Sequence, residues 1–275
     1  MPLLSDASAI YVGSTEADRV YLGSTLVWEK QVTDPASSFP VSPLALYDFS
    51  DLSTLFQDSA GTIPVTAHGQ RVGRVVDKSG NGLHLTTSDS RRPEYREVHG
   101  KRWLYLNGVD QDMDVNMPQI DEELVIAAGA RIDVEPTTNG QIFGVASNVY
   151  GLATLYVRAS STNRWGFSRS FLSTGSGGAI LSSNTRPVPE FAVVRGMATR
   201  SGTSKLYRNA EEIGSGSPGS VQIAAQTWNL GNSASSSILR YRGLISGVAL
   251  YARALSPAEV ITLDQFLAER TGVTL

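Results

Sequence analysis

Cysteine is absent from this 275-residue chain, and charged side chains are scarce. Without cysteine the chain has no disulfide framework and no thiol chemistry, which fits folding in a bacterial-type cytosol. Charged residues make up 18% of the chain and the formal net charge is −3. No run of Lys and Arg forms the basic patch of a nucleic-acid-binding protein, and the pair Arg91-Arg92 is predicted to be a solvated loop before Pro93. We therefore expect no nucleic-acid partner.

Long apolar stretches are also missing. No stretch approaches the roughly 20 apolar residues that a membrane-spanning helix requires. The opening sequence MPLLSDASAI lacks a basic region followed by an apolar core, so it does not match a secretion signal. We expect neither membrane insertion nor classical export. A chain of this kind that acts outside a cell would reach its place by another route, such as cell lysis.

The first thirty residues contain an internal repeat. Tyr11-Val-Gly-Ser-Thr15 recurs as Tyr21-Leu-Gly-Ser-Thr25, and Leu26-Val-Trp28 closes the second copy. Alternating apolar residues interrupted by Gly-Ser are typical of a small β-meander. So short a module buries too little surface to fold alone, so we expect it to dock onto an assembly or onto the rest of the chain. The residues expected at that contact are Tyr11, Val12, Tyr21, Leu22 and Trp28.

The chain is predicted to have three parts. Residues 1–30 form the small β module, and residues 31–43, rich in Pro, Ser and Thr, form a semi-stiff linker. Residues 44–275 form one large domain, in which short apolar segments alternate with Gly-, Ser- and Asn-rich turns, as in an antiparallel sandwich. Strands are predicted at 45–49, 124–134, 141–145, 152–158, 164–169, 191–199, 205–208 and 227–230.

The end of the chain predicts a strand followed by a helix. Large apolar side chains occur at both alternating sets of positions in residues 244–251, which favours a strand buried on both faces. Ser256 can cap a helix in which Pro257 and Glu259 occupy the first turn. The predicted apolar stripe and the C-terminal stop of that helix are Val260, Leu263, Phe266, Leu267 and Gly272.

Two parts of the large domain carry a resemblance to a known family. The pattern formed by Tyr251, Arg253, Leu255, Ser256 and Glu259 resembles the closing element of laminin-G-like, concanavalin A-like jelly rolls. Residues 48–85, continued by 92–95 and 104–110, resemble the front half of such domains in phage tail and head-fibre proteins. The resemblance implies an all-β, concanavalin A-like (laminin-G) jelly-roll sandwich, with a small N-terminal β module and a short C-terminal helix.

The repeat in residues 1–30 also resembles short attachment modules of virion proteins from tailed phages and gene transfer agents. This resemblance implies a location on the virion surface, after synthesis in the bacterial cytoplasm and release by lysis. It implies that residues 1–30 bind other virion proteins. We also expect a homo-oligomer, with a trimer favoured, because many copies of a weak site bind strongly together.

The sharpest candidate for catalysis is Arg131-Ile-Asp-Val-Glu135. Concanavalin-like glucanases carry Glu-x-Asp-x-Glu on one strand, whose period of two places all three acids on one face. Here Arg131 replaces the first acid, so only Asp133 and Glu135 remain. Because retaining hydrolysis needs two suitably placed carboxyl groups, we expect no catalytic residues here, and both acids are predicted to cap a strand end before Pro136.

Asp110-Gln-Asp-Met-Asp114 is the densest acidic cluster. Asp110, Asp112 and Asp114 are the candidate metal ligands, and Ca²⁺ is the cation that would suit them. The segment lacks the following Gly and the distant Glu of a calcium loop, so the alternative is solvated strand ends. No cofactor is otherwise expected, and His68, His84 and His99 lack zinc-site spacing.

Aromatic residues beside hydrogen-bonding side chains are the candidates for a glycan site, since sugars present apolar C–H faces ringed by hydroxyls. Alternation places Tyr156 and Arg158 on one face of a strand. The alternative is that the aromatic rings fill the sandwich core. The candidate residues, in two groups, are Tyr156, Arg158, Asn163, Arg164, Trp165 and Arg169, and then Trp228 and Asn232.

The sequence therefore favours a non-catalytic adhesin on a phage-like virion, a fibre, spike or minor tail protein, that binds host surface polysaccharide. One alternative is a purely structural decoration or assembly protein of the virion. The other is a glycosidase or depolymerase.

Overall fold

The computed structural model describes residues 43–121, 123–133, 139–145, 153–158, 164–169, 179–183, 186–199, 204–217, 222–232 and 239–275, together with four short strands before residue 30. The chain divides into two compact units, Met1–Ser38 and Phe39–Leu275. The predicted linker, residues 31–43, lies almost entirely outside the described residues.

The first unit contains two hairpins, one for each copy of the repeat. Strand β1 (Tyr11–Val12) pairs with β2 (Thr15–Glu16), and β3 (Arg19–Leu22) pairs with β4 (Thr25–Glu29). The pairs Val12↔Thr15 and Leu22↔Thr25 flank the Gly-Ser of each copy. The side chains of the five predicted contact residues lie outside the described part of the chain, so docking through them stays a prediction.

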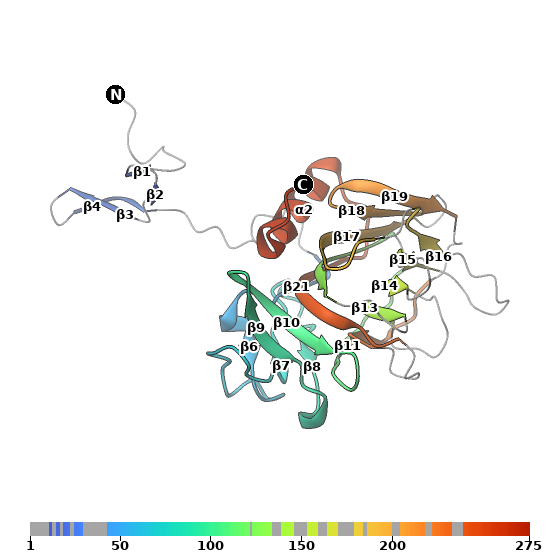
Figure 1. Cartoon of the computed structure of the whole chain (residues 1–275), viewed down its shortest axis with the longest axis horizontal. Coiled ribbons are helices and arrows are strands. Elements are labelled where there is room, and N and C mark those ends of the chain that lie inside the picture. Colours follow the sequence, from blue (N-terminus) through green and yellow to red (C-terminus); the bar gives the residue numbers. More distant parts are fainter. Residues whose placement is uncertain are drawn as a thin grey trace. The chain divides into compact units, whose positions relative to one another are not determined.

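The second unit consists of two antiparallel sheets (Figure 1). In the described part of the chain, one has eight strands in the order β19 (Glu211–Gly216), β18 (Ser204–Arg208), β17 (Glu190–Ala198), β12 (Leu124–Ile132), β21 (Arg242–Tyr251), β10 (Lys101–Asn107) and β9 (Glu94–Val98), with β5 (Ala45–Asp48) also pairing β21. The other has nine strands in the order β16 (Ala179–Leu181), β15 (Arg164–Ser168), β14 (Thr154–Arg158), β13 (Gly140–Val145), β20 (Gln226–Leu230), β11 (Met113–Met117), β8 (Leu85–Thr86), β7 (Arg74–Val75) and β6 (Leu55–Phe56).

The hydrophobic core lies between these sheets. Alternate residues of each strand enter it, as a period of two requires; in β11 these are Met113, Val115 and Met117. At its centre the ring of Phe143 lies 6.0 Å from that of Tyr47 and 5.5 Å from that of Trp228, centroid to centroid. The fold is an all-β jelly-roll sandwich with one short C-terminal helix, which confirms the predicted fold class.

The last strand departs from the simple alternation expected of it. Gly129 pairs with Gly247 but Ala130 pairs with Ile245, so Ser246 is an extra residue that forms a β-bulge. The bulge shifts the alternation of side chains between the two faces of the strand by one residue. Ile245 and Val248, which lie on either side of it, therefore both belong to the core between the sheets. The strand is buried on both faces, as predicted, but one bulge reassigns which residues share a face.

Helix α2 (Pro257–Thr271) begins and ends as the sequence predicts. Ser256 Oγ accepts from the Glu259 N–H and the Glu259 carboxylate accepts from the Ser256 N–H, a complete capping box. Gly272 ends the helix with φ of 75°. Arg253 Nη2 lies 2.6 Å from Glu259 Oε1 and helps to hold the pKa of that carboxyl at about 2. The family-like pattern here is therefore a helix-start device. No described helix has the length and hydropathy to cross a membrane.

The hairpin between β18 and β19 has a two-residue turn, Asn209-Ala210. Asn209 and Ala210 have φ of 49° and 67°, the left-handed pair of a type I′ turn. A left-handed alanine costs about 1 kcal/mol or more, because its Cβ approaches the backbone, whereas glycine has no Cβ.

Replacing Ala210 with glycine is therefore expected to stabilise the protein by about 1 kcal/mol, less the greater freedom of glycine in the unfolded chain. Chemical denaturation of the full-length chain measures the free energy of unfolding. Ala254→Gly, at an exposed position without positive φ, serves as the control and should give no gain. A loss of stability in Ala210→Gly would contradict the assigned turn.

Candidate functional site

The outward faces of the two sheets differ in what covers them. Helix α2 packs on the eight-stranded sheet, where Leu267 approaches Gly247 and the Thr271 methyl approaches Gly129. An added Cβ at Gly129 would lie 2.5 Å from that methyl, so the close approach needs glycine. The nine-stranded sheet carries polar residues on its outward face instead, and this face is the candidate site.

Strand register places these polar residues in a row across the sheet. Residues directly opposite on neighbouring antiparallel strands point to the same face. The row continues from strand to strand through pairs in register. Its polar members are Arg74, Thr86, Asp114, Asn229, Thr154 and Ser168, and Gly144 lies between Asn229 and Thr154. The row joins segments that are more than ninety residues apart in the sequence.

A hydrogen-bonded cluster, the Arg91 network, stands at the middle of this face. Arg91 Nε donates to Asp112 Oδ1, and Arg91 Nη2 lies 3.1 Å from Asp114 Oδ2. Asn229 Nδ2 donates to Asp114 Oδ1 at 2.6 Å, and Asn232 Nδ2 donates to Asp112 Oδ2 at 3.1 Å. The Asn232 backbone N–H donates to Asn229 Oδ1 at 2.8 Å. The Oδ1 atom of Asn232 is buried and accepts no hydrogen bond within the described chain, so it remains able to accept one.

The Arg91 network corrects the prediction that Arg91 lies in a merely solvated loop. Asp112 is buried, and burial raises the pKa of its carboxyl, an effect that Arg91 opposes. Asp112 and Asp114 converge on one guanidinium, and each of their four oxygens accepts a hydrogen bond. An acid–base pair for hydrolysis needs carboxyl oxygens directed at the substrate, whereas these carboxylates are directed at Arg91, Asn229 and Asn232.

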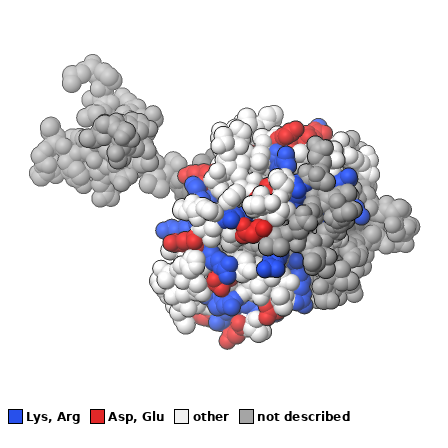
Figure 2. All heavy atoms as spheres, viewed as in Figure 1, with Lys and Arg blue, Asp and Glu red and all other residues white. Residues whose placement is uncertain are grey.

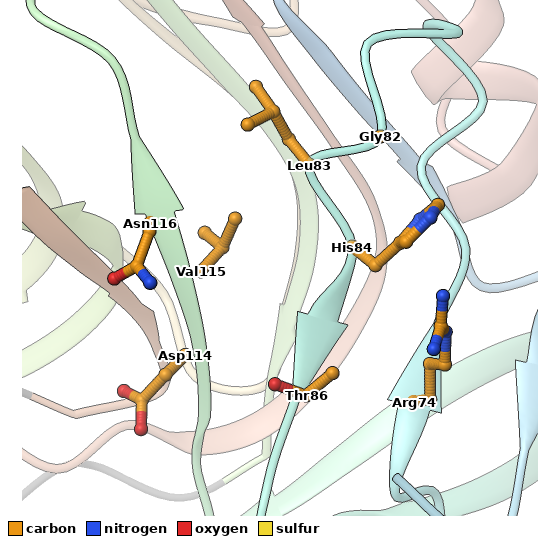
Figure 3. A pocket seen from close by; sticks show the side chains of 8 residues that line it. All are labelled: Arg74, Gly82, Leu83, His84, Thr86, Asp114, Val115 and Asn116. Carbon is orange, nitrogen blue, oxygen red and sulfur yellow. The ribbon is translucent and has the colours of Figure 1, made fainter. Parts of the chain in front are cut away.

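A pocket of 320 Å³ opens beside the Arg91 network, and we call it the wedge pocket (Figure 3). Strands β8 and β11 share one residue pair, Asp114↔Thr86. The two strands separate beyond that pair, as Figure 3 shows, and the pocket occupies the gap. Its lining residues are Arg74, Gly82, Leu83, His84, Thr86, Asp114, Val115 and Asn116.

Three of the predicted glycan-contact residues come together at the far side of the same face. Leu155 and Val157 enter the core, so Tyr156 and Arg158 face outward together, as predicted. Arg158 and Arg164 are directly opposite in register. The half-buried ring of Tyr156 lies over Gly166, where an added Cβ would come within 2.3 Å of Tyr156 Cζ. Burial raises the pKa of the Tyr156 hydroxyl to about 12.

Asn232 belongs to the Arg91 network, and Gln141 connects it with the Tyr156 side. Gln141 pairs with Tyr156 in register, and its Nε2 donates to the Asn232 carbonyl at 2.8 Å. The same Nε2 also donates to the carbonyls of Gly144 and Asn229. Gln141 is fully buried and thus fixes the backbone of both sides of the face.

The remaining predicted glycan residues are placed differently. Trp165 and Trp228 have no exposed surface and belong to the core cluster, so neither ring can stack on a sugar. Arg169 is equally buried and donates to the Ala198 carbonyl. These three placements correct the prediction. For Trp165 and Trp228 the reason is the alternative already weighed, that large aromatic side chains fill the core. Asn163 lies outside the described residues.

The acidic residues considered as metal ligands or catalytic acids interact with different partners. Asp110 accepts from Asn107 Nδ2 at 2.7 Å, away from the guanidinium that Asp112 and Asp114 share. Within the described ranges, no three His, Asp or Glu side chains are grouped as a metal site would need. Asp133 lies 2.7 Å from Arg131 Nη2, and Glu135 lies outside the described residues.

Sequence reasoning missed most of the wedge pocket. Arg74, His84, Thr86 and Asn116 were not predicted as site residues. The strict alternation of Met113-Asp-Val-Asn-Met117 would have placed Asp114 and Asn116 on one outward face. Nothing local indicates that Arg74 lies across the sheet from them. Figure 2 shows both charge signs interspersed over the described surface in view, so local pairs dominate its electrostatics.

These features define a two-sheet β-sandwich with polar side chains on one outward face. Asn229, Thr154 and Ser168 of that face are buried, whereas Asn116 is exposed beside the wedge pocket. The chain belongs to the concanavalin A-like lectin/glucanases superfamily: a laminin-G-type family model matches residues 110–261, more than half of its length. This confirms the concanavalin A-like, laminin-G-like part of the resemblance. No curated protein sequence matches the chain at a significant level.

Solved structures share the fold at low sequence identity. Domain 4 of AbnA, an extracellular arabinanase of Geobacillus stearothermophilus solved with arabinotriose, is similar with a TM-score of 0.52 and 17% identity, covering 82% of this chain and 98% of that domain. A Trypanosoma rangeli sialidase has a TM-score of 0.51 and 14% identity, covering 80% of this chain and 32% of its own. The chain thus spans about a third of the sialidase. The botulinum neurotoxin type G receptor-binding domain has a TM-score of 0.53 and 10% identity, covering 82% and 51%.

Proposed function

We propose that this protein binds glycans, without hydrolysing them, through the outward face of its nine-stranded sheet. The observation that carries this proposal is the contrast between the two sheets. One outward face is covered by helix α2, while the other carries Arg, Asp, Asn, Thr and Tyr side chains fixed by register and by the Arg91 network. Sugar recognition needs a few polar groups held in fixed positions beside an apolar surface, and Tyr156 supplies such a surface.

The similar solved structures support the glycan part of the proposal. One of them is a domain held in complex with arabinotriose, and that domain is covered over nearly its whole length. The non-catalytic part is supported by the geometry of the described acids. Asp112 and Asp114 are directed at Arg91, and Asp133 is paired with Arg131.

The biological setting that we propose is the surface of a phage-like virion. Residues 1–30 would attach the chain to other virion proteins, and the sandwich would bind host surface polysaccharide. Two hairpins with a repeated sequence support an attachment module, since so short a unit gains stability by docking. We expect a homo-oligomer, with a trimer favoured, because several weak sites on one particle bind with high avidity.

A glycan array probed with the multimerised full-length chain tests the binding function. We expect binding to a subset of bacterial surface polysaccharides, with no release of reducing sugar on incubation. Absence of binding by the multimer would favour a structural decoration protein instead. Sugar release that ends with Glu135→Gln or Asp112→Asn would favour a glycosidase. A density map of the assembled particle, showing what residues 1–30 contact, tests the attachment role.

A further inference from the structure

The wedge pocket has the size of a small subsite. At 320 Å³ it lies at the lower end of the range for small-molecule pockets, so it suits a single sugar unit rather than an extended oligosaccharide. Its two sides come from different strands. Arg74 and His84 lie on the β7–β8 side, and Asp114 and Asn116 lie on β11 (Figure 3). The β7–β8 side therefore contributes basic side chains, and the β11 side contributes a carboxylate and an amide.

The β7–β8 side carries the positive charge of Arg74, which forms no ion pair with an acidic side chain of the described residues. Arg74 Nη1 donates to the Ala60 carbonyl at 3.3 Å. Within the described ranges Arg74 has no carboxylate at ion-pair distance, whereas Arg91 has two. Gly61 lies against the stem of Arg74: an added Cβ there would be 3.0 Å from Arg74 Cδ. The guanidinium is thus held in place with donors to spare for an anion.

His84 adds a neutral donor beside that charge. Its Nδ1 accepts the Asp77 backbone N–H at 3.1 Å, so the neutral ring carries its proton on Nε2. Burial, followed by the charge of Arg74, lowers the pKa of His84, which keeps the ring neutral near pH 7. The β7–β8 side therefore offers hydrogen-bond donors and one full positive charge.

The β11 side suits hydroxyl groups. Asn116 Oδ1 accepts from Thr227 Oγ1 at 2.9 Å, which directs its amide nitrogen away to donate elsewhere. Asp114 lines the pocket, but its two carboxylate oxygens accept from Arg91 and Asn229. The Thr86 hydroxyl lies between the two sides (Figure 3).

We propose that the wedge pocket binds one acidic sugar unit, with its carboxylate on Arg74 and its hydroxyls on Asn116 and Thr86. A guanidinium recognises a carboxylate through parallel N–H···O bonds, which a neutral sugar cannot form. The inference rests on the proposed glycan-binding function and names the glycan class of that face.

Matched pairs of oligosaccharides test the inference on the full-length chain. The probes are uronic-acid oligosaccharides (glucuronate and galacturonate) and the same oligosaccharides with each carboxyl group reduced to an alcohol. Calorimetry should show at least tenfold tighter binding of the acidic member, since hydrogen bonds to charged groups are the strong ones. Arg74→Gln should remove that preference, because it lowers the affinity for the acidic member far more than the affinity for the reduced member. Arg74→Lys keeps the positive charge but loses the two parallel N–H donors of the guanidinium. This variant should retain part of the preference for the acidic member.

Arg71→Gln is the matched control, because Arg71 is exposed, close in sequence and donates to the Arg92 carbonyl outside the pocket. This variant should keep the preference for the acidic member. Equal affinity for both members, or an unchanged preference in Arg74→Gln, would overturn the acidic-sugar inference while leaving glycan binding intact. Failure of the multimerised chain to bind either member, or any glycan on the array, would overturn the proposed function as well.

Discussion

Asp264→Ala is expected to lower the free energy of unfolding by about 3–5 kcal/mol, because it leaves a buried arginine without its counter-ion. Arg195 of β17 and Asp264 of α2 form two parallel hydrogen bonds of 3.0 Å, and both side chains are 4% exposed. Arg195 also lies over the ring of Tyr207, with Cζ 4.1 Å from the centroid. Removal of the carboxylate leaves the guanidinium buried beside a ring and the Met197 sulfur, neither of which carries a compensating charge.

Thermal and denaturant unfolding measure this effect, and a loss of this size in a domain of more than 200 residues corresponds to about 10 °C in the melting temperature. Two variants complete the experiment. Glu269→Ala, which removes a carboxylate that is 80% exposed on the same helix, should have little effect. The double replacement Arg195→Met with Asp264→Leu should recover most of the loss, because a buried ion pair and an apolar pair of similar volume are comparable in stability. If Asp264→Ala were as stable as the parent protein, this ion pair would not be what holds α2 on the sheet.

Local sequence patterns predicted the elements of this fold well, because the forces that fix them act over a few residues. The capping box of Ser256 and Glu259 and the glycine at 272 are complete within the sequence of the helix. The strands that were predicted begin and end close to their predicted bounds, since apolar alternation and Gly-rich turns mark them, but β9, β10 and β11 were not among them. The bulge at Ser246 escaped prediction because it depends on a neighbouring strand, in which Gly129 and Ala130 pair on either side of it.

The candidate site could be predicted only in part, because its members meet through register rather than through sequence spacing. Tyr156 and Arg158 share a face of one strand, and alternation revealed this. Trp165 also obeys alternation, but the sequence does not say which of the two faces is the core. Arg91 meets Asp112 only after the two strands between them in the sequence, β9 and β10, have paired. Long-range ion pairs of this kind leave no local signal.

The Arg91 network leads to the second large effect. Arg91→Gln is expected to lower the free energy of unfolding at pH 7 by about 2 kcal/mol, less than for the fully buried pair because the Arg91 side chain is 36% exposed. The variant leaves Asp112, which is 3% exposed, with a single donor from Asn232. It also leaves Asp114 with Asn229 alone. Two carboxylates near each other then lack a cation.

The decrease in the free energy of unfolding caused by Arg91→Gln should depend on pH, and the pKa of Asp112 determines the direction. Burial raises the pKa of Asp112 in the folded protein and Arg91 lowers it, so Arg91→Gln raises that pKa further. A folded carboxyl with a raised pKa binds its proton more tightly than the unfolded chain does. Its contribution to stability is therefore fully present below the ordinary carboxyl pKa of about 4 and is lost as the pH rises through the folded pKa. The difference between parent and variant should grow from pH 4 to pH 7.

Denaturant unfolding at pH 4, 5.5 and 7 measures this dependence, with Arg92→Gln as the neighbouring control. Arg92 pairs with Asp89, whose side chain is 87% exposed, so its loss should be smaller and should vary less with pH. A loss in Arg91→Gln that is equal at all three pH values would show that Asp112 is not its origin. Asp112 and Asp114 belong to the network that orders the face beside the wedge pocket, so the same variant should also weaken glycan binding at pH 7. If Arg91→Gln lost stability but kept its full affinity for glycan, the Arg91 network would not contribute to glycan binding.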